Sequence, residues 1–249
     1  PLGIGAKPYF NHLVVEDRDL GPSNCLTTGK SMSKERVINL YERGLAIGKS
    51  SKQPILISES VPGGTTTAQA VMEAFGLQVS NLVGSSLFKA PRELRRKVVQ
   101  KGLLNSNLKT DFDSFDVVAS LGDPFQAFSM GLLIGARSAN QPVILSGGSQ
   151  MIAVILLVLE FLGVKNKDDF IGVSLLCTIG ENVSKYIVLA AIKAKSLAVR
   201  WAMDFAGCCG YQTSTFRFDA SNGFRRLPCN PKQHTNASVL GAGMVLKSK

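Results

Sequence analysis

Cysteine, histidine and long apolar runs are all scarce in this sequence. Five cysteines in 249 residues are an odd number and too few for a disulfide scaffold, which favours a reducing, cytoplasmic compartment. The two histidines, His12 and His234, give little support to a hydrolase triad, because no serine or cysteine lies in a nucleophile-elbow pattern. The apolar run at 151–159 ends at Glu160 and is far shorter than the ~18–20 residues of a membrane span. We therefore expect no transmembrane helix.

Leader, phosphate-loop and zinc motifs are missing as well. Pro1 is not an initiator methionine, which suggests a fragment, and no basic segment followed by an apolar one predicts a secretory signal. Gly29-Lys30-Ser31 resembles the end of a P-loop, but Asn24 stands where its first glycine belongs. Cys208 and Cys209 are adjacent and lack the two-residue spacer of zinc sites. We expect neither a metal nor a cofactor.

The composition is that of a globular protein with an anionic partner. Hydrophobic residues make up 45%, which excludes wholesale disorder, and the length fits one large domain or one domain with a small appendage. The net charge of +10 suggests a phosphate-bearing metabolite, a nucleic acid or an acidic surface as partner. Basic and aromatic residues do not interleave and no reading motif is present, so a nucleic acid is not expected.

From residue 54 onward the sequence repeats an apolar run, a glycine-rich turn and a segment with helical spacing. Continuous apolar strands covered by helices are typical of parallel sheets. We therefore predict a Rossmann-like α/β fold, with a doubly wound, mostly parallel sheet and helices on both faces. Strands are predicted at 54–58, 116–119, 142–145 and 171–176, and helices at 34–47, 65–75, 124–139 and from about 149 to 162, the last of them interior or at an oligomer interface.

The rest of the chain is organised around this core. We assign 1–53 to an N-terminal loop and helix within the same domain, 54–205 to the α/β core with the ligand site, and 206–249 to an irregular C-terminal segment. Within the core, 197–205 is expected to be helical.

The glycine-rich turns are the best candidates for a ligand site, because ligands of open parallel sheets bind where strands end and helices begin. Glu59 ends the first strand and is followed by two glycines and three threonines, a pattern suited to an anion held by backbone amides. An ordinary turn with a threonine cap explains the same residues. Gly122-Asp123-Pro124 and Ser146-Gly147-Gly148-Ser149 add a carboxylate and a second turn. The cations of 92–97 and Lys101 face either a phosphate or the solvent.

Three blocks carry a resemblance to a known family: Glu59-Ser60-Val61-Pro62-Gly63-Gly64-Thr65-Thr66-Thr67-Ala68, Gly122-Asp123-Pro124-Phe125-Gln126 and Leu145-Ser146-Gly147-Gly148-Ser149-Gln150-Met151. Together they resemble the archaeal and cyanobacterial branch of the nicotinate-nucleotide:dimethylbenzimidazole phosphoribosyltransferases, over roughly residues 21–173. The resemblance implies a Rossmann-like homodimer that transfers phosphoribose from nicotinate mononucleotide to a benzimidazole, making the lower-ligand nucleotide of cobamides. It also implies that Gly63, Gly64, Thr65, Thr66, Lys97, Gly147 and Gly148 bind the nucleotide and that Ser85 and Ser86 lie near the base pocket.

The C-terminal part departs from that family. Members carry a candidate general base in the form Glu-Gly-Val-Gly-Ala-Gly, whereas this chain has Ser238-Val239-Leu240-Gly241-Ala242-Gly243. A serine hydroxyl is no base near neutral pH without a partner, so Glu59 or Asp123 becomes the candidate, with Ser238 at the family position. A divergent enzyme, a non-catalytic homologue that binds a nucleotide or benzimidazole, and a damaged or truncated copy all fit this departure.

Overall fold

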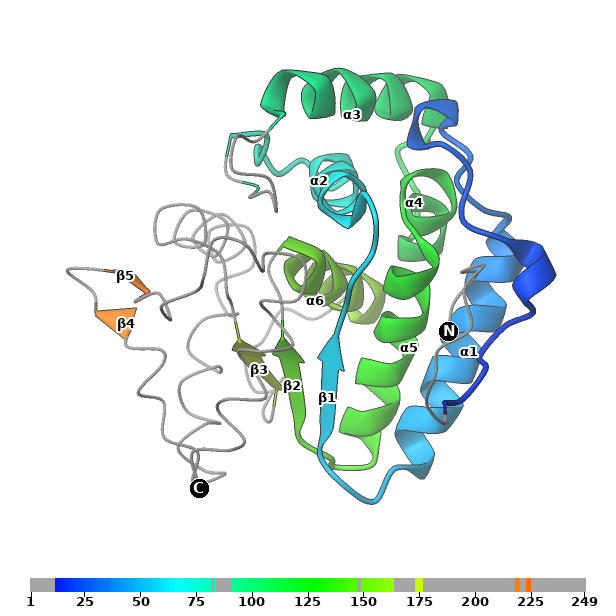
Figure 1. Ribbon diagram of the computed structural model, residues 1–249, viewed down its shortest axis with the longest axis vertical. Coiled ribbons are helices and arrows are strands. Elements are labelled where there is room, and N and C mark those ends of the chain that lie inside the picture. Colours follow the sequence, from blue (N-terminus) through cyan, green and yellow to red (C-terminus); the bar gives the residue numbers. More distant parts are fainter. Residues whose placement is uncertain are drawn as a thin grey trace.

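A small parallel sheet lies at the centre of the computed structural model, which describes residues 12–81, 83, 91–146, 149–163, 173–176, 218–219 and 223–224. Its strands are β1 (Ile55–Ser58), β2 (Val143–Ser146) and β3 (Val173–Leu176), in the order β1-β2-β3 (Figure 1). Ser58 pairs with Ser146 in register, so β1 and β2 end side by side. The predicted α/β class with a parallel sheet is confirmed. Two short strands, β4 (Phe218–Asp219) and β5 (Gly223–Phe224), form a separate antiparallel pair.

Most described residues outside the sheet are helical. The helices are α1 (Lys34–Ser50), α2 (Gly64–Ala74), α3 (Arg92–Ser106), α4 (Ser114–Leu121), α5 (Pro124–Ser138) and α6 (Ser149–Leu162), with short 3-10 turns η1 (Arg18–Leu20) and η2 (Leu26–Thr28). The N-termini of two helices, α1 and α5, follow directly from the sequence. Ser33 accepts a hydrogen bond from the backbone N–H of Arg36 at 3.1 Å, and Pro124 stands in the first turn of α5, where its missing donor is harmless.

The strand predicted at 116–119 is wrong, because these residues lie in α4. Asp113 and Asp116 form a capping box: Asp113 Oδ1 accepts from the Asp116 N–H at 2.7 Å, and Asp116 Oδ2 accepts from the Asp113 N–H at 3.1 Å. Val117 and Val118 are fully buried on this short helix. A short apolar run of this kind fits a buried helix as well as a strand, and the cap settles which one forms.

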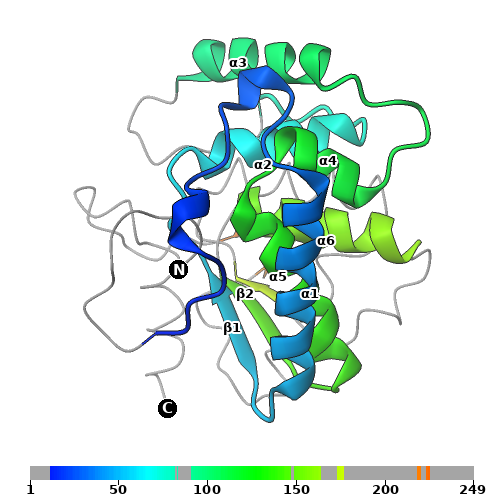
Figure 2. The same cartoon turned by 90° about the vertical axis from the view of Figure 1, so that its right-hand side faces the viewer.

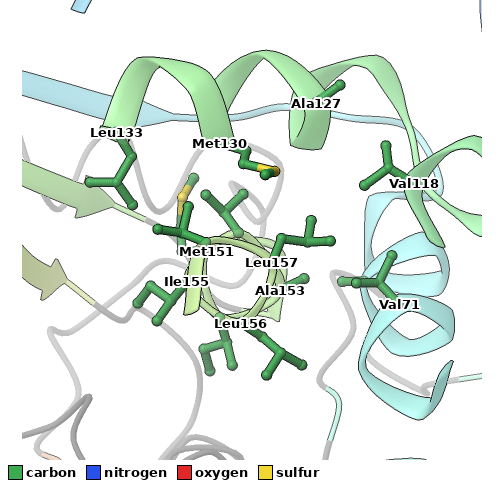
Figure 3. Close-up of a cluster of buried hydrophobic side chains, with 14 of the residues drawn as sticks. Val71, Val118, Ala127, Met130, Leu133, Met151, Ala153, Ile155, Leu156 and Leu157 are labelled. Carbon is green, nitrogen blue, oxygen red and sulfur yellow. The ribbon is translucent and has the colours of Figure 1, made fainter. Parts of the chain in front are cut away.

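Helix α6 forms the centre of the hydrophobic core. Every residue from Met151 to Leu159 is buried, as the apolar sequence predicted for an interior helix. Figure 3 shows side chains of α6 surrounded by Val71 of α2, Val118 of α4 and Met130 of α5. No helix within the described ranges has the length and apolar character that crossing a bilayer requires.

Helices α1 and α5 pack closely along much of their length (Figure 2). Glycines allow the approach: a Cβ atom on Gly131 would overlap the carbonyl oxygen of Tyr41, and one on Gly44 would overlap that of Phe128. Gly48 and Gly135 repeat the arrangement one turn further along each helix. This contact fixes α5, whose N-terminus carries Asp123.

Candidate functional site

Glu59 follows β1 directly and lies at the carboxyl end of the sheet. Its side chain folds back so that Oε2 accepts a hydrogen bond from the backbone N–H of Val61 at 2.6 Å. Glu59 is partly buried, and Oε1 accepts no hydrogen bond from the described residues. Burial raises the pKa of Glu59 above its ordinary value, the Val61 N–H opposes that shift, and the negative charge of Asp123 adds to it.

The N-terminus of α2, four residues further on, has no side-chain cap. Gly63 occupies the N-cap position with φ of 76°, in the left-handed region that favours glycine. The backbone N–H groups of Gly63 and Thr65 find no acceptor among the described residues. A Cβ built on Gly63 would meet no atom of the described residues within 4 Å. Unpaired amides and the positive end of the helix dipole make this position suited to an anion.

Asp123, by contrast, is a buried side chain, only 2% exposed, at the N-cap of α5. Its Oδ1 accepts a hydrogen bond from the backbone N–H of Gln126 at 3.1 Å. Its Oδ2 receives two more, from Thr67 Oγ1 of α2 at 2.5 Å and from Gln150 Nε2 of α6 at 2.7 Å. One carboxylate therefore joins the first turns of three helices.

The groups that donate hydrogen bonds to Asp123 are polar but uncharged. Burial raises its pKa above the ordinary range, although the hydrogen bonds from Thr67, Gln150 and the backbone of Gln126 and Phe125 act in the opposite direction. The described residues contain no group of three histidine, cysteine or acidic side chains able to hold a metal. The three helix N-termini supply positive potential instead.

Gly64 leaves room for the side chain of Gln150 of α6 against the start of α2. A Cβ on Gly64 would lie 2.6 Å from Gln150 Nε2 and 3.0 Å from the Cβ of Val61. Figure 1 shows α2 and α6 beyond the carboxyl ends of β1 and β2. The turn after β1 and the first turn of α6 therefore meet, as expected for strand ends of one parallel sheet.

The structure brings together part of the predicted site. The carboxyl end of β1 and the N-termini of α2 and α5 carry four of these residues: Glu59, Gly63, Gly64 and Asp123. The first turn of α2 also contains Thr65 and Thr66, which are partly buried. Lys97 is exposed on α3, which packs against α2, α4 and η2, and no described contact ties it to Asp123. The predicted roles of these residues stay predictions. Five predicted residues lie outside the described part of the chain: Ser85, Ser86, Gly147, Gly148 and Ser238.

Sequence reasoning gave no role to the side chains of Gln126 and Gln150, and it assigned the Thr67 hydroxyl to the anion pattern instead of to Asp123. Gln126 had a local signal, because Asp-Pro-Phe-Gln places a glutamine three residues after a capping aspartate. Thr67 lies in the quoted threonine run, and Gln150 comes two residues after a glycine pair. Nothing local shows that these two side chains meet Asp123.

Comparisons with known proteins agree with this architecture. Residues 4–162 match the family model DBI_PRT, described as phosphoribosyltransferase. A UPF0284 protein of Prochlorococcus marinus (strain MIT 9312) is 90% identical over 180 residues, which are 72% of this chain and 47% of the relative. A UPF0284 protein of Methanocaldococcus jannaschii is 35% identical over 159 residues, 64% of this chain and 44% of the relative. The chain thus spans about half the length of these relatives.

Two solved structures share the fold. CobT from Thermus thermophilus is 17% identical with a TM-score of 0.57, over 71% of this chain and 52% of that one. A nicotinate-nucleotide-dimethylbenzimidazole phosphoribosyltransferase from the same organism is 19% identical with a TM-score of 0.56, over 71% of this chain and 51% of that one. At this identity the likeness establishes the fold.

Proposed function

Because the chain belongs to the phosphoribosyltransferase family whose model it matches, we propose that it transfers the 5-phosphoribosyl group of nicotinate mononucleotide to a benzimidazole base. The product is the lower-ligand nucleotide of cobamides, and the working form is the homodimer that the family resemblance implies. The observation that carries the proposal is the uncapped N-terminus of α2 next to the partly buried Glu59. That arrangement offers an anion site and a carboxylate at one strand end.

The phosphate of the nucleotide fits the N-terminus of α2. The open N–H groups of Gly63 and Thr65 are donors for its oxygens, and the helix dipole favours its negative charge. The hydroxyls of Thr65 and Thr66 are further donors in the same turn. Asp113 and Asp123 occupy the equivalent positions of α4 and α5, where their side chains already accept the end N–H groups.

The transfer needs a carboxylate more than an acid. When the bond between ribose and the pyridinium nitrogen breaks, its electron pair neutralises that nitrogen, so nicotinate leaves without needing a proton. A benzimidazole nitrogen then forms the new bond to the ribosyl carbon, and the N–H proton of the ring passes to a base. Glu59 suits both needs: its negative charge stabilises the electron-poor ribosyl centre, and its raised pKa makes it a better proton acceptor than an ordinary glutamate.

Ser238 supports a second candidate function. It stands where the resembling family carries a glutamate ahead of its glycine-rich C-terminal segment, and its hydroxyl does not replace a base. A homologue without that glutamate retains the anion site at α2. The alternative is therefore a protein that binds a nucleotide or a benzimidazole without turnover.

The decisive experiment measures nicotinate released from nicotinate mononucleotide in the presence of dimethylbenzimidazole. We expect release by the wild-type chain and a loss of about 10²–10⁴-fold in Glu59→Gln. Glu73→Gln is the matched control, because Glu73 is another partly buried carboxyl of raised pKa, near the far end of α2. No release by the wild type or by Ser238→Glu would refute transfer. Saturable binding in calorimetry without release would favour the binding homologue, and no heat with either ligand would exclude both.

A further inference from the structure

We propose that Asp123 is a positioning residue, which holds the first turn of α2 through Thr67 and joins it to α6 through Gln150, and that it does not touch the substrate. The identity of the ligand at α2 rests on the proposed function. The positioning itself rests on the contacts of Asp123. It assigns roles to Thr67 and Gln150 and changes the catalytic role first predicted for Asp123.

Both oxygens of Asp123 are already bonded within the protein. Oδ1 caps α5 by accepting from the Gln126 N–H, and Oδ2 accepts from Thr67 and Gln150. Only 2% of the residue is exposed, so the protein shields both oxygens from a ligand at the start of α2. A base must reach the proton that it removes. Glu59 meets that requirement better, because it is partly exposed and its Oε1 accepts no hydrogen bond from the described residues.

Thr67 transmits the position of Asp123 to the glycine turn. Its Oγ1 lies 2.5 Å from Asp123 Oδ2 and 3.0 Å from the carbonyl oxygen of Gly64. Its backbone N–H donates to the carbonyl oxygen of Gly63 at 3.3 Å. Thr67 thus contacts both glycines, and a shift of its side chain moves the turn that carries the uncapped N–H groups.

Gln126 fixes the orientation of the link to α6. Its Nε2 donates to Gln150 Oε1 at 2.7 Å, so the amide nitrogen of Gln150 is turned toward Asp123 Oδ2. Gln126 and Gln150 are 0% and 2% exposed, and each amide group lacks water as an alternative partner. Buried networks of this kind hold one arrangement because any other leaves a polar group unsatisfied.

Four variants test the proposal through nucleotide kinetics. Thr67→Val removes the hydroxyl at nearly constant volume, and Thr67→Ser keeps it. Asp123→Asn removes the negative charge and replaces one of the two acceptor oxygens by an NH2 group. Asp113→Asn is the matched control, because Asp113 forms the same capping box on α4. We expect Thr67→Val and Asp123→Asn to raise the KM for nicotinate mononucleotide about tenfold with kcat little changed. Thr67→Ser should restore the wild-type KM, and Asp113→Asn should not change it.

The double variant Thr67→Val/Asp123→Asn should bind no more weakly than Asp123→Asn alone, because both changes break one link. A loss of about 100-fold or more in kcat for Asp123→Asn, with Thr67→Val unaffected, would overturn the proposal and make Asp123 a group that touches the reacting atoms. Should Asp123→Asn fail to fold, the KM values of Thr67→Val and Thr67→Ser still test the positioning role.

Amide hydrogen exchange separates this proposal from the proposed function. We expect the N–H groups of Thr66, Thr67 and Ala68 to exchange about tenfold faster in Thr67→Val and Asp123→Asn, and at the wild-type rate in Asp113→Asn. Unchanged exchange in both site variants would overturn the positioning role, whatever the protein binds. If both site variants exchange faster while the wild type neither binds nor converts nicotinate mononucleotide, the positioning role is retained and the proposed function is refuted.

Discussion

A pair of glycines at opposite ends of α2 offers a sharp test of the anion site. Gly63 at the N-terminus and Gly76 just beyond the C-terminus have φ values of 76° and 83°, and a Cβ on either would meet no atom of the described residues within 4 Å. Alanine in the left-handed region costs about 1–2 kcal/mol, and the lower freedom of the unfolded chain offsets about 0.4–1 kcal/mol of that. Each variant, Gly63→Ala and Gly76→Ala, should lose about 1 kcal/mol in its free energy of unfolding.

Binding should separate the two variants. In the proposed complex, the methyl group of Gly63→Ala would take up room beside the phosphate of nicotinate mononucleotide, whereas Gly76 lies at the far end of α2. Losing one hydrogen bond to a charged group is worth about 1.5–3 kcal/mol, a weakening of about 10- to 150-fold. Gly76→Ala should bind as the wild type does.

The assay pairs urea unfolding with calorimetry, using nicotinate mononucleotide and then inorganic phosphate as titrants. Equal stability loss with weaker binding in Gly63→Ala alone is the expected result. If Gly63→Ala binds nicotinate mononucleotide as tightly as the wild type, the phosphate does not lie at the start of α2. Equal loss of affinity in both variants would mean that the effect is one of general stability.

Two further predictions concern stability. Burial raises the pKa of Glu59 in the folded state, so ionisation of this carboxyl destabilises the protein as the pH rises from the pKa of the unfolded chain through that of the folded one. Glu59→Gln should therefore have a higher urea-unfolding free energy than the wild type at pH 7.5, and this gain should shrink toward pH 4. A lower free energy of unfolding at both pH values would contradict this. Gly131→Ala forces a methyl group onto the Tyr41 carbonyl and should lower the free energy of unfolding by about 3 kcal/mol or more, despite the higher helix propensity of alanine. The control Ser138→Ala, at an exposed position of the same helix, should change the free energy of unfolding by less than about 1 kcal/mol. A stable Gly131→Ala would mean that α1 and α5 separate easily.

Local sequence signals predicted the elements whose ends are marked by a side chain. Ser33 and Pro124 gave the starts of α1 and α5, and the apolar runs before Glu59 and Gly147 gave β1 and β2. Residues 116–119 were predicted incorrectly because an apolar run of four fits either structure. The capping box that decides for α4 is itself a sequence pattern, and reading Asp113 together with Asp116 would have favoured the helix.

In the candidate site, too, groupings of residues close together in the sequence could be predicted, and contacts between distant residues could not. Glu59, Gly63 and Gly64 are neighbours in the chain, so their grouping at a strand end could be predicted. Thr67 and Gln150 reach Asp123 across 56 and 27 residues. Such meetings depend on how α2, α5 and α6 pack, and the side chain of Gln150 also needs the room that Gly64 leaves. No periodicity in the sequence predicts these contacts between helices.

Glu59 and Asp123 show why residue type alone could not assign the chemistry. Each is an acidic residue at a turn between elements of the core, and burial is the largest cause of a raised pKa in both. Their remaining contacts differ: Asp123 has both oxygens bonded to protein donors, while Glu59 bonds one oxygen to Val61 and is partly exposed. Since the charge of Asp123 also raises the pKa of Glu59, the buried carboxyl contributes to the basicity of the partly buried one. Two carboxyls with different surroundings thus support different roles, one structural and one chemical.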